Sequence, residues 1–178
     1  MLDKVIVTLP LPDAAMTPLR ERFDVIAWTD SEPLPEATLH EWVQDSAAIL
    51  CSVGNPITGA TIARAEGRLK VISTISVGVD HIDIGAATAA GIPVGHTPDV
   101  LTDSTADMAM ALMLACTRRI AESDRFVRAG GWQGSWSAEL FLGRDLSRST
   151  VGLVGLGPIG QAVARRLQGF GAEVIAYN

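Results

Sequence analysis

The stretch STVGLVGLGPIGQAVARRLQGFGAEVIAYN, residues 149–178, decides the fold of the chain around it. An apolar run at Val151–Val154 leads into Gly155–Gly160, where glycine occupies the first, third and sixth positions. A helix-like segment follows to about Gln168, and a second apolar run covers Glu173–Tyr177. A Gly-x-Gly-x-x-Gly motif alone is weak, but its place between a strand and a helix predicts a βαβ unit with parallel strands.

Each glycine of this motif has a physical task in a dinucleotide site. Gly155 permits a tight turn out of the strand, Gly157 lets the backbone approach a pyrophosphate, and Gly160 lets helix and strand pack closely. Pro158 at the helix start costs no intrahelical hydrogen bond, and the free N–H groups at that end attract phosphate. A glycine-rich turn without a ligand is the alternative. The predicted cofactor-binding loop comprises Gly155, Leu156, Gly157, Pro158, Ile159 and Gly160.

The residue at the end of the second strand bears on which nicotinamide dinucleotide is bound. A carboxylate there accepts hydrogen bonds from the ribose 2′-hydroxyl of NAD and repels the 2′-phosphate of NADP. This chain has Asn178, whose side chain is a neutral amide. The sequence therefore predicts NAD(P) as cofactor, with NADP favoured.

Before this region, short apolar runs alternate with polar, helix-like segments. The rhythm predicts βαβ units and a parallel sheet covered on both faces, as one doubly wound domain of about a hundred residues. The predicted strands are Lys4–Thr8, Asp24–Trp28, Ala47–Leu50, Lys70–Thr74 and Ile92–His96. The predicted helices are Asp13–Arg22, Glu36–Asp45 and Thr58–Glu66, with Asp13 and Thr58 as N-caps.

The sequence changes character after the fifth of these runs. A long helix is predicted over Ser104–Val127, and its part Met108–Cys116 is apolar almost all round, which indicates burial against protein on several sides. A domain crossover or a subunit contact would explain such burial. The irregular segment that follows contains Trp132, Trp136 and Phe141, and aromatic side chains on such a segment need a partner surface. Packing on the same chain and a dimerisation arm both stay open.

Composition narrows the function classes. The 178 residues are 48% hydrophobic and 19% charged, as in a soluble globular protein. A net charge of −6 and a pI near 5.0 argue against nucleic acid and anionic membranes as partners. Cys51 and Cys116 stand in apolar runs without metal-ligand spacing, so we expect two buried, reduced thiols and no metal. The N-terminal run does not resemble a signal peptide, and we expect a cytoplasmic protein.

Several polar residues suggest sites but favour ordinary roles. Asp80, His81 and Asp83 could suggest a metal or acid–base site. Neighbouring residues in a turn diverge, however, and no third ligand has suitable spacing. We therefore expect a solvated turn and a helix cap there. His96 stands isolated in the sequence and is expected to have no role in a site.

Two stretches together carry a family resemblance. The first is KVISTISVGVDHIDIGAATAAGIPVGHTPDVLTDSTADMAMALML at 70–114, and the second is GLVGLGPIGQAVARRL at 152–167. They resemble the D-isomer-specific 2-hydroxyacid dehydrogenase family. TPDVLTDSTAD at 97–107 and GGW at 130–132 are most similar to glyoxylate/hydroxypyruvate reductases. The resemblance implies an α/β fold with parallel sheets: a flavodoxin-like substrate domain over 1–100, then the start of a Rossmann dinucleotide-binding domain over 101–178.

The resemblance also assigns site residues outside the glycine loop. Backbone N–H groups of Val77 and Gly78 would bind the substrate carboxylate, and Thr105 would approach the nicotinamide. A glycine at the carboxyl end of a strand in a doubly wound sheet independently lies where ligands bind. A plain turn, and helix capping or first-turn packing by Thr105, are the alternatives. We also expect a homodimer built mainly on the cofactor domain.

The implied reaction is hydride transfer between NAD(P)H and a small 2-oxo or 2-hydroxy acid, D-specific, with glyoxylate or hydroxypyruvate as substrate. The family performs it with an Arg, a Glu and a His in motifs that follow the Rossmann half found here. We therefore expect this chain to be an N-terminal half with no catalytic residue of its own, inactive alone. A non-catalytic, NAD(H)-sensing corepressor-like scaffold is the alternative, as is another family enzyme such as a phosphoglycerate or formate dehydrogenase.

Overall fold

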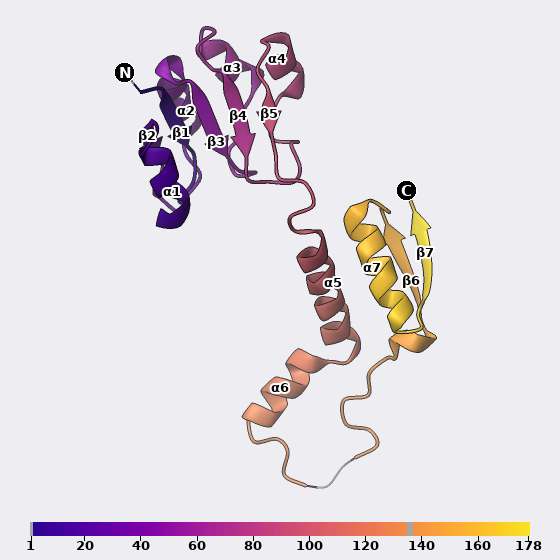
Figure 1. Ribbon diagram of the computed structural model, residues 1–178. Helices are drawn as coiled ribbons and strands as arrows, with labels where there is room; N and C mark the ends of the chain where they lie inside the picture. Colours follow the sequence, from indigo (N-terminus) through magenta and orange to yellow (C-terminus); the bar gives the residue numbers. More distant parts are fainter. Residues whose placement is uncertain (1, 135–136) are drawn as a thin grey trace. The chain divides into compact units, whose positions relative to one another are not determined.

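The computed structural model describes residues 2–134 and 137–178. The chain divides into two compact units, Met1–Pro98 and Asp99–Asn178 (Figure 1). Each unit has its own parallel sheet and its own cluster of buried apolar side chains. Within the described residues, no helix is both long and apolar enough to cross a membrane.

The first unit is built on a five-stranded sheet in which neighbouring strands run parallel. Its spatial order, β2-β1-β3-β4-β5, is that of flavodoxin-like doubly wound folds. The prediction of a flavodoxin-like parallel α/β fold is therefore confirmed. The strands are β1 (Lys4–Val7), β2 (Asp24–Ala27), β3 (Ala48–Cys51), β4 (Val71–Thr74) and β5 (Val94–Gly95).

Helix starts in this unit follow capping chemistry. Thr58 is the N-cap of α3, as predicted, and its hydroxyl accepts a backbone N–H from the first turn. Asp83 caps α4 in the same way, also as expected. The prediction for Asp13 is wrong: extended Pro12 is the N-cap, and Asp13 is the first helical residue. The helical elements are α1 (Asp13–Arg20), α2 (Glu36–Trp42), η1 (Val43–Asp45), α3 (Gly59–Arg64) and α4 (Ile84–Ala89).

The core of the first unit lies on one face of its sheet. Ile6, Ile49 and Ile72 come from neighbouring strands and are fully buried there. On the other face Val5 and Val7 of β1 are buried, but the alternate residues of β3 and β4 are only half-buried. The prediction of a sheet covered on both faces is therefore only half right for this chain. The helices contribute Leu39, Ile62 and Ala87 to the core cluster.

The second unit begins with two helices where one was predicted. Arg119 interrupts the helix because its backbone is left-handed, with φ 54°. Arg119 forms an ion pair with Glu122 of the next helix, and its guanidinium lies 5.2 Å from the centroid of the Phe141 ring in a cation–π contact. The prediction of a single helix over Ser104–Val127 is therefore wrong at Arg119. The two helices are α5 (Thr102–Thr117) and α6 (Ile120–Arg128).

The remainder of this unit is the βαβ unit that the glycine motif predicts. Strands β6 and β7 are parallel, with Val151 opposite Val174. Pro158 is the first residue of the helix between them, where its missing N–H costs no hydrogen bond. The elements are η2 (Leu146–Arg148), β6 (Thr150–Val154), α7 (Pro158–Gly169) and β7 (Glu173–Tyr177).

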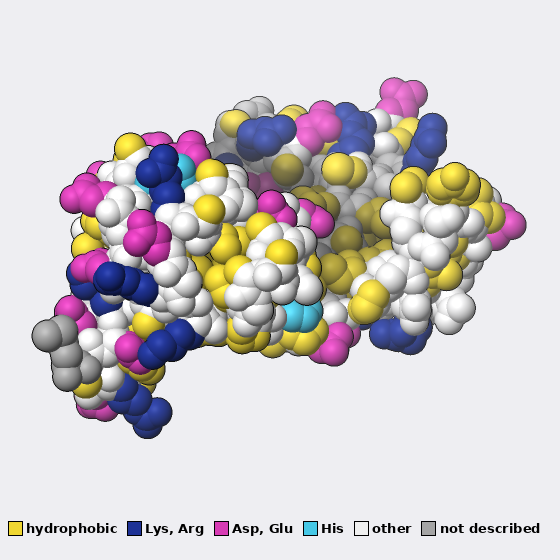
Figure 2. All heavy atoms as spheres, turned by 90° about the horizontal axis from the view of Figure 1, so that it is seen from above, with side chains coloured by type: hydrophobic (Ala, Val, Ile, Leu, Met, Phe, Trp, Pro, Cys, Tyr) yellow, Lys and Arg dark blue, Asp and Glu magenta, His cyan; other side chains and the backbone are white. Residues whose placement is uncertain are grey.

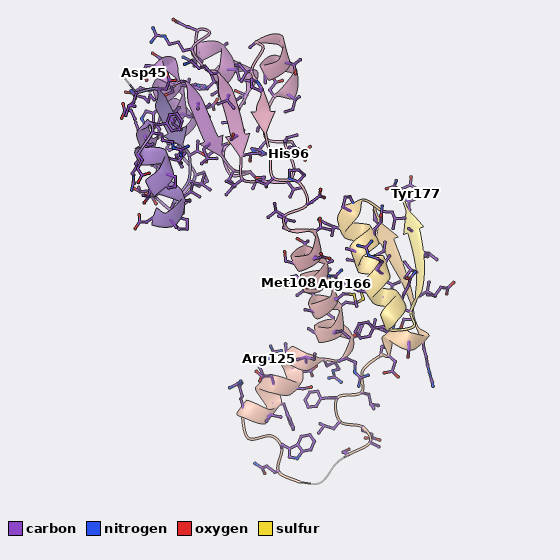
Figure 3. All side chains as sticks on the ribbon, in the orientation of Figure 1. Asp45, His96, Met108, Arg125, Arg166 and Tyr177 are labelled. Carbon is purple, nitrogen blue, oxygen red and sulfur yellow. The ribbon has the colours of Figure 1, made fainter. Side chains whose placement is uncertain are left out.

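Helix α7 is fastened to α5 by apolar packing and by ion pairs. Ala106 and Met110 of α5 are buried in one cluster with the apolar face of α7. Arg166 points from α7 toward α5 (Figure 3), and its guanidinium lies 3.1 Å from a carboxylate oxygen of Asp103 and 2.6 Å from one of Asp107. The first turns of α5 are thereby fixed to the helix that follows the glycine loop.

The opposite face of α5 carries exposed apolar side chains. Met108, Leu112 and Cys116 recur at four-residue spacing and all lie exposed. Among the described residues of this unit, the face toward α7 is the covered one. Burial of the other face, against another domain or a subunit, stays a prediction. The same geometry corrects the prediction for Cys116, whereas Cys51 is buried as predicted.

Other apolar side chains of the second unit also reach its surface, as Figure 2 shows in yellow. Tyr177 and Val154 of the two-stranded sheet are largely exposed. In the aromatic segment, Phe141 packs edge-on against Phe126, with ring centroids 5.0 Å apart, so this side chain packs on its own chain. Trp132 is half exposed, and Trp136 lies outside the described residues. A dimerisation arm stays a prediction.

Candidate functional site

The glycine loop between β6 and α7 makes a tight turn. Gly155 has φ 97°, a conformation that L side chains rarely adopt, and its N–H donates to the carbonyl oxygen of Tyr177 at 2.7 Å. A Cβ on Gly160 would overlap the carbonyl oxygen of Gly155. Both glycines are therefore required by the chain's own backbone, as the motif predicts.

Among the described residues, no contact or backbone conformation requires a glycine at position 157. It is the N-cap of α7 with φ −68° and ψ −172°, which any residue can adopt, and no heavy atom lies within 4 Å of an added Cβ. Beside this open space, the N–H groups of Ile159 and Gly160 have no acceptor among the described residues. An open space bordered by free N–H groups at a helix N-terminus suits a phosphate group. The loop therefore fits the pyrophosphate of a dinucleotide.

Both the backbone N–H and the backbone carbonyl of Leu156 form hydrogen bonds to side chains. Its N–H donates to Oδ1 of Asn178 at 3.1 Å, and its carbonyl accepts from Nε2 of Gln161 at 2.9 Å. The N–H of Leu156 is thus taken, while the amide nitrogen of Asn178 has no acceptor among the described residues and could donate to a ligand. Sequence reasoning missed Gln161. Only its place one residue after the last motif glycine could have indicated this contact.

Thr105 lies in the first turn of α5 with an exposed side chain. The N-cap position of α5 belongs to Leu101, and no side chain caps this helix. Thr105 therefore neither caps the helix nor packs in the core, which disfavours both of its ordinary roles. Its approach to a nicotinamide stays a prediction.

The second candidate site is the turn Ser76–Gly78 at the carboxyl end of β4. Within the described part of the chain, the N–H groups of Val77 and Gly78 have no acceptor. The carbonyl of Val77, in contrast, accepts from Nδ1 of His96 at 2.9 Å. Because these two N–H groups are free, the turn can offer a pair of donors to an anion such as a carboxylate.

The segment after β5 also holds the carbonyl of Ser76 and that of Ile75, the residue before the turn. Thr97 donates its N–H to the carbonyl of Ser76 at 3.1 Å and its hydroxyl to the carbonyl of Ile75 at 3.0 Å. His96 lies just beyond the arrowhead of β5 in Figure 3. His96 is therefore not isolated in the fold, because it contacts the candidate turn. The separation of about twenty residues between turn and partners hid the contact from sequence reasoning.

Below the turn lies a small polar cluster at the ends of β3 and β4. Nε2 of His81 is 3.0 Å from the hydroxyl of Thr74 and 3.8 Å from Sγ of Cys51. Burial lowers the pKa of His81 below its ordinary value, with Asp80 offsetting part of the shift, and burial raises the pKa of the Cys51 thiol to about 11. His81 is thus not part of a solvated turn as expected. The described residues contain no cluster that could hold a metal ion.

A family model described as D-isomer specific 2-hydroxyacid dehydrogenase, catalytic domain, matches residues 5–175. The glyoxylate reductase of Thermococcus onnurineus is 42% identical, with 100% of this chain and 54% of that protein covered. The glyoxylate reductase/hydroxypyruvate reductase of Mus musculus is 43% identical, with 99% and 54% covered. The chain thus spans about half the length of the curated relatives it matches.

Solved structures agree with this match. A crystal structure of a protein from Thermus thermophilus has a TM-score of 0.87 at 45% identity, over 97% of this chain and 55% of that one. The D-lactate dehydrogenase of Aquifex aeolicus, solved with NAD and lactic acid, has a TM-score of 0.81 at 29% identity, over 99% of this chain and 51% of that one. An NADPH-dependent glyoxylate/hydroxypyruvate reductase of Sinorhizobium meliloti, solved with citrate, has a TM-score of 0.77 at 28% identity, over 99% of this chain and 54% of that one. The chain belongs to the D-isomer specific 2-hydroxyacid dehydrogenase family.

Proposed function

We propose that the complete protein is an NAD(P)H-dependent, D-specific reductase of a small 2-oxo acid, glyoxylate or hydroxypyruvate. Similarity to named relatives and the geometry of the glycine loop both support this proposal. Relatives that share about two fifths of the sequence are named glyoxylate or hydroxypyruvate reductases. The observation that carries most weight is the glycine loop, where the space beside Gly157 is open and bordered by free N–H groups.

In this proposal the first unit is the substrate domain and the second is the beginning of the cofactor domain. Val77 and Gly78 bind the substrate carboxylate through their N–H groups, and Thr105 lies against the nicotinamide side of the cofactor. A bound nicotinamide supplies the hydride. The proton-transferring His, its Glu and the carboxylate-binding Arg of the family are assigned to no residue of this chain.

The test is a coupled measurement of binding and turnover on the complete protein. We expect NADPH to bind and to be oxidised when glyoxylate or hydroxypyruvate is added, with the D-hydroxy acid formed from hydroxypyruvate. Binding of the cofactor without turnover of either acid would favour the corepressor-like scaffold. Turnover restricted to another 2-oxo acid would place the protein elsewhere in the family.

Cofactor preference gives a second prediction. Asn178 brings no negative charge to the ribose, so we expect kcat/KM to be higher with NADPH than with NADH, by about tenfold or more, which corresponds to about 1.4 kcal/mol. In Asn178→Asp a carboxylate oxygen can still accept from the N–H of Leu156, as Oδ1 does now, but the added charge repels a 2′-phosphate. The preference should then reverse. Equal use of both cofactors by the parent protein would contradict the NADP assignment.

We also propose a homodimer that uses the exposed face of α5, defined by Met108, Leu112 and Cys116. An apolar stripe of this kind is costly in water and indicates a protein contact. Leu112→Glu in the complete protein should shift the dimer to monomer in sedimentation at micromolar concentration. The matched control is Leu2→Glu, because Leu2 is 58% exposed and Leu112 is 59% exposed, and Leu2 lies in the other unit. A monomeric parent would refute the proposal.

A further inference from the structure

The polar cluster below the turn has a defined direction of hydrogen bonding. The hydroxyl of Thr74, which is 3% exposed, donates to Oγ of Ser76 at 3.1 Å and accepts the N–H of Ser76 at 3.2 Å. A threonine hydroxyl has one proton and two lone pairs. Since its proton is already engaged, Thr74 can only accept from His81, whose Nε2 lies 3.0 Å away.

The hydrogen bonds of Cys51 independently indicate that His81 is the donor. Its thiol donates to the carbonyl of Ser73 at 3.4 Å, which engages its single proton. It can therefore only accept from Nε2 of His81, at 3.8 Å. Both counts place a proton on Nε2. The lowered pKa of His81 agrees with a neutral imidazole that keeps its one proton on this nitrogen.

The Thr74 hydroxyl is well placed to order the turn. His96 and Thr97 hold the turn by its carbonyl oxygens, from the segment after β5. Among the described residues, the N–H and hydroxyl of Ser76 are bound only by Thr74. His81 uses the second lone pair of Thr74 and so fixes the rotation of that hydroxyl. The imidazole thereby acts on Ser76 through Thr74, one residue before the two free N–H groups.

We propose that His81 is a positioning residue that holds the Ser76–Gly78 turn, through Thr74, in the conformation that offers Val77 and Gly78 to the substrate carboxylate. This inference rests on the proposed function for its substrate and on the geometry alone for the ordering of the turn. His81 touches neither the substrate nor the cofactor in this scheme. Its loss should therefore act on substrate binding and leave the cofactor site unchanged.

The experiment compares His81→Leu with His81→Gln in the complete protein. Leucine removes the N–H donor, whereas the glutamine amide can place an N–H near the position of Nε2. For His81→Leu we expect a KM for glyoxylate about five- to tenfold higher, the effect of one neutral hydrogen bond, with KM for NADPH unchanged. His81→Gln should recover most of the loss. Thr74→Val, which keeps the side-chain shape, should reproduce the effect if His81→Leu folds poorly.

A second pair of residues supplies the matched control. Thr61 is 0% exposed, and its hydroxyl lies 3.1 Å from Nε2 of His40, away from the turn. Thr61→Val therefore removes a buried threonine–histidine hydrogen bond of the same kind. It should lower the melting temperature about as much as Thr74→Val and leave the KM for glyoxylate unchanged. An equal rise of KM in Thr61→Val would mean that general destabilisation, not positioning, causes the effect, and would overturn the inference.

Amide hydrogen exchange separates this inference from the proposed function. His81→Leu leaves the acceptor of the Ser76 N–H in place, so a several-fold faster exchange of that amide would show that the imidazole orders the turn. Unchanged exchange together with unchanged KM would overturn the role of His81. If the parent protein binds NADPH but reduces no 2-oxo acid, the proposed function fails. The exchange rate of Ser76 then decides whether His81 orders the turn.

Discussion

Replacing Gly157 with valine in the complete protein should weaken NADPH binding by at least about a hundredfold, equivalent to about 2.7 kcal/mol. The backbone of Gly157 is in an ordinary extended conformation, and an added Cβ meets no heavy atom of the chain within 4 Å. The chain therefore leaves room at this position for the first atom of a side chain. It would fill the space that a pyrophosphate needs beside the N-terminus of α7. Fluorescence titration with NADPH measures the effect directly.

Two controls make this result specific. Gly169→Val places the same side chain at the other end of α7, where an added Cβ also meets nothing within 4 Å, and it should leave NADPH affinity unchanged. Gly160→Ala should instead destabilise the fold, because its Cβ would overlap the Gly155 carbonyl. Melting temperatures separate the two kinds of effect. An unaltered NADPH affinity in a well-folded Gly157→Val variant would show that the loop does not bind the cofactor.

Local patterns explain why much of the fold could be predicted. Runs rich in valine and isoleucine mark strands buried in a parallel sheet, and every predicted strand has a counterpart in the structure. The break at Arg119 could not be predicted, because a left-handed backbone is uncommon for arginine and one of its contacts, with Phe141, comes from twenty-two residues further along the chain. The exposed face of α5 escaped prediction for a related reason. Apolar composition shows that a surface prefers a partner, but it does not say whether the partner belongs to the same chain.

The two candidate sites, one in each unit, differ in the same way. The glycine loop is a local device, so the spacing of Gly155, Gly157 and Gly160 was sufficient to predict its geometry. The turn depends on partners that the fold brings in from elsewhere: His96 reaches Val77 from nineteen residues away. Single histidines in a sequence offer no sign of such a contact, since a histidine has no periodic pattern that would indicate its partner. Folding alone reveals which carbonyls are held and which N–H groups stay free.

The free N–H groups of this turn lead to the second large effect. Gly78→Pro should lower kcat/KM for glyoxylate roughly ten- to a hundredfold, because a charge-assisted hydrogen bond to the carboxylate, about 1.5–3 kcal/mol, is lost with the N–H. Proline removes this donor and fixes φ. The change lies in the first unit, whereas the glycine loop lies in the second, so affinity for NADPH should stay the same. Steady-state kinetics with glyoxylate, beside a titration with NADPH, measure both.

Gly78→Ala distinguishes the loss of the donor from the presence of a side chain. An added Cβ at this position meets only Oδ2 of Asp80, at 3.5 Å, which is an ordinary van der Waals distance. Alanine therefore keeps the N–H in place, and its kcat/KM should stay within about threefold of the parent, a difference below about 1 kcal/mol. Equal losses in both variants would point to crowding of the turn. Parental efficiency in a well-folded Gly78→Pro variant would show that the substrate carboxylate binds elsewhere, since no other change at this position removes the donor itself.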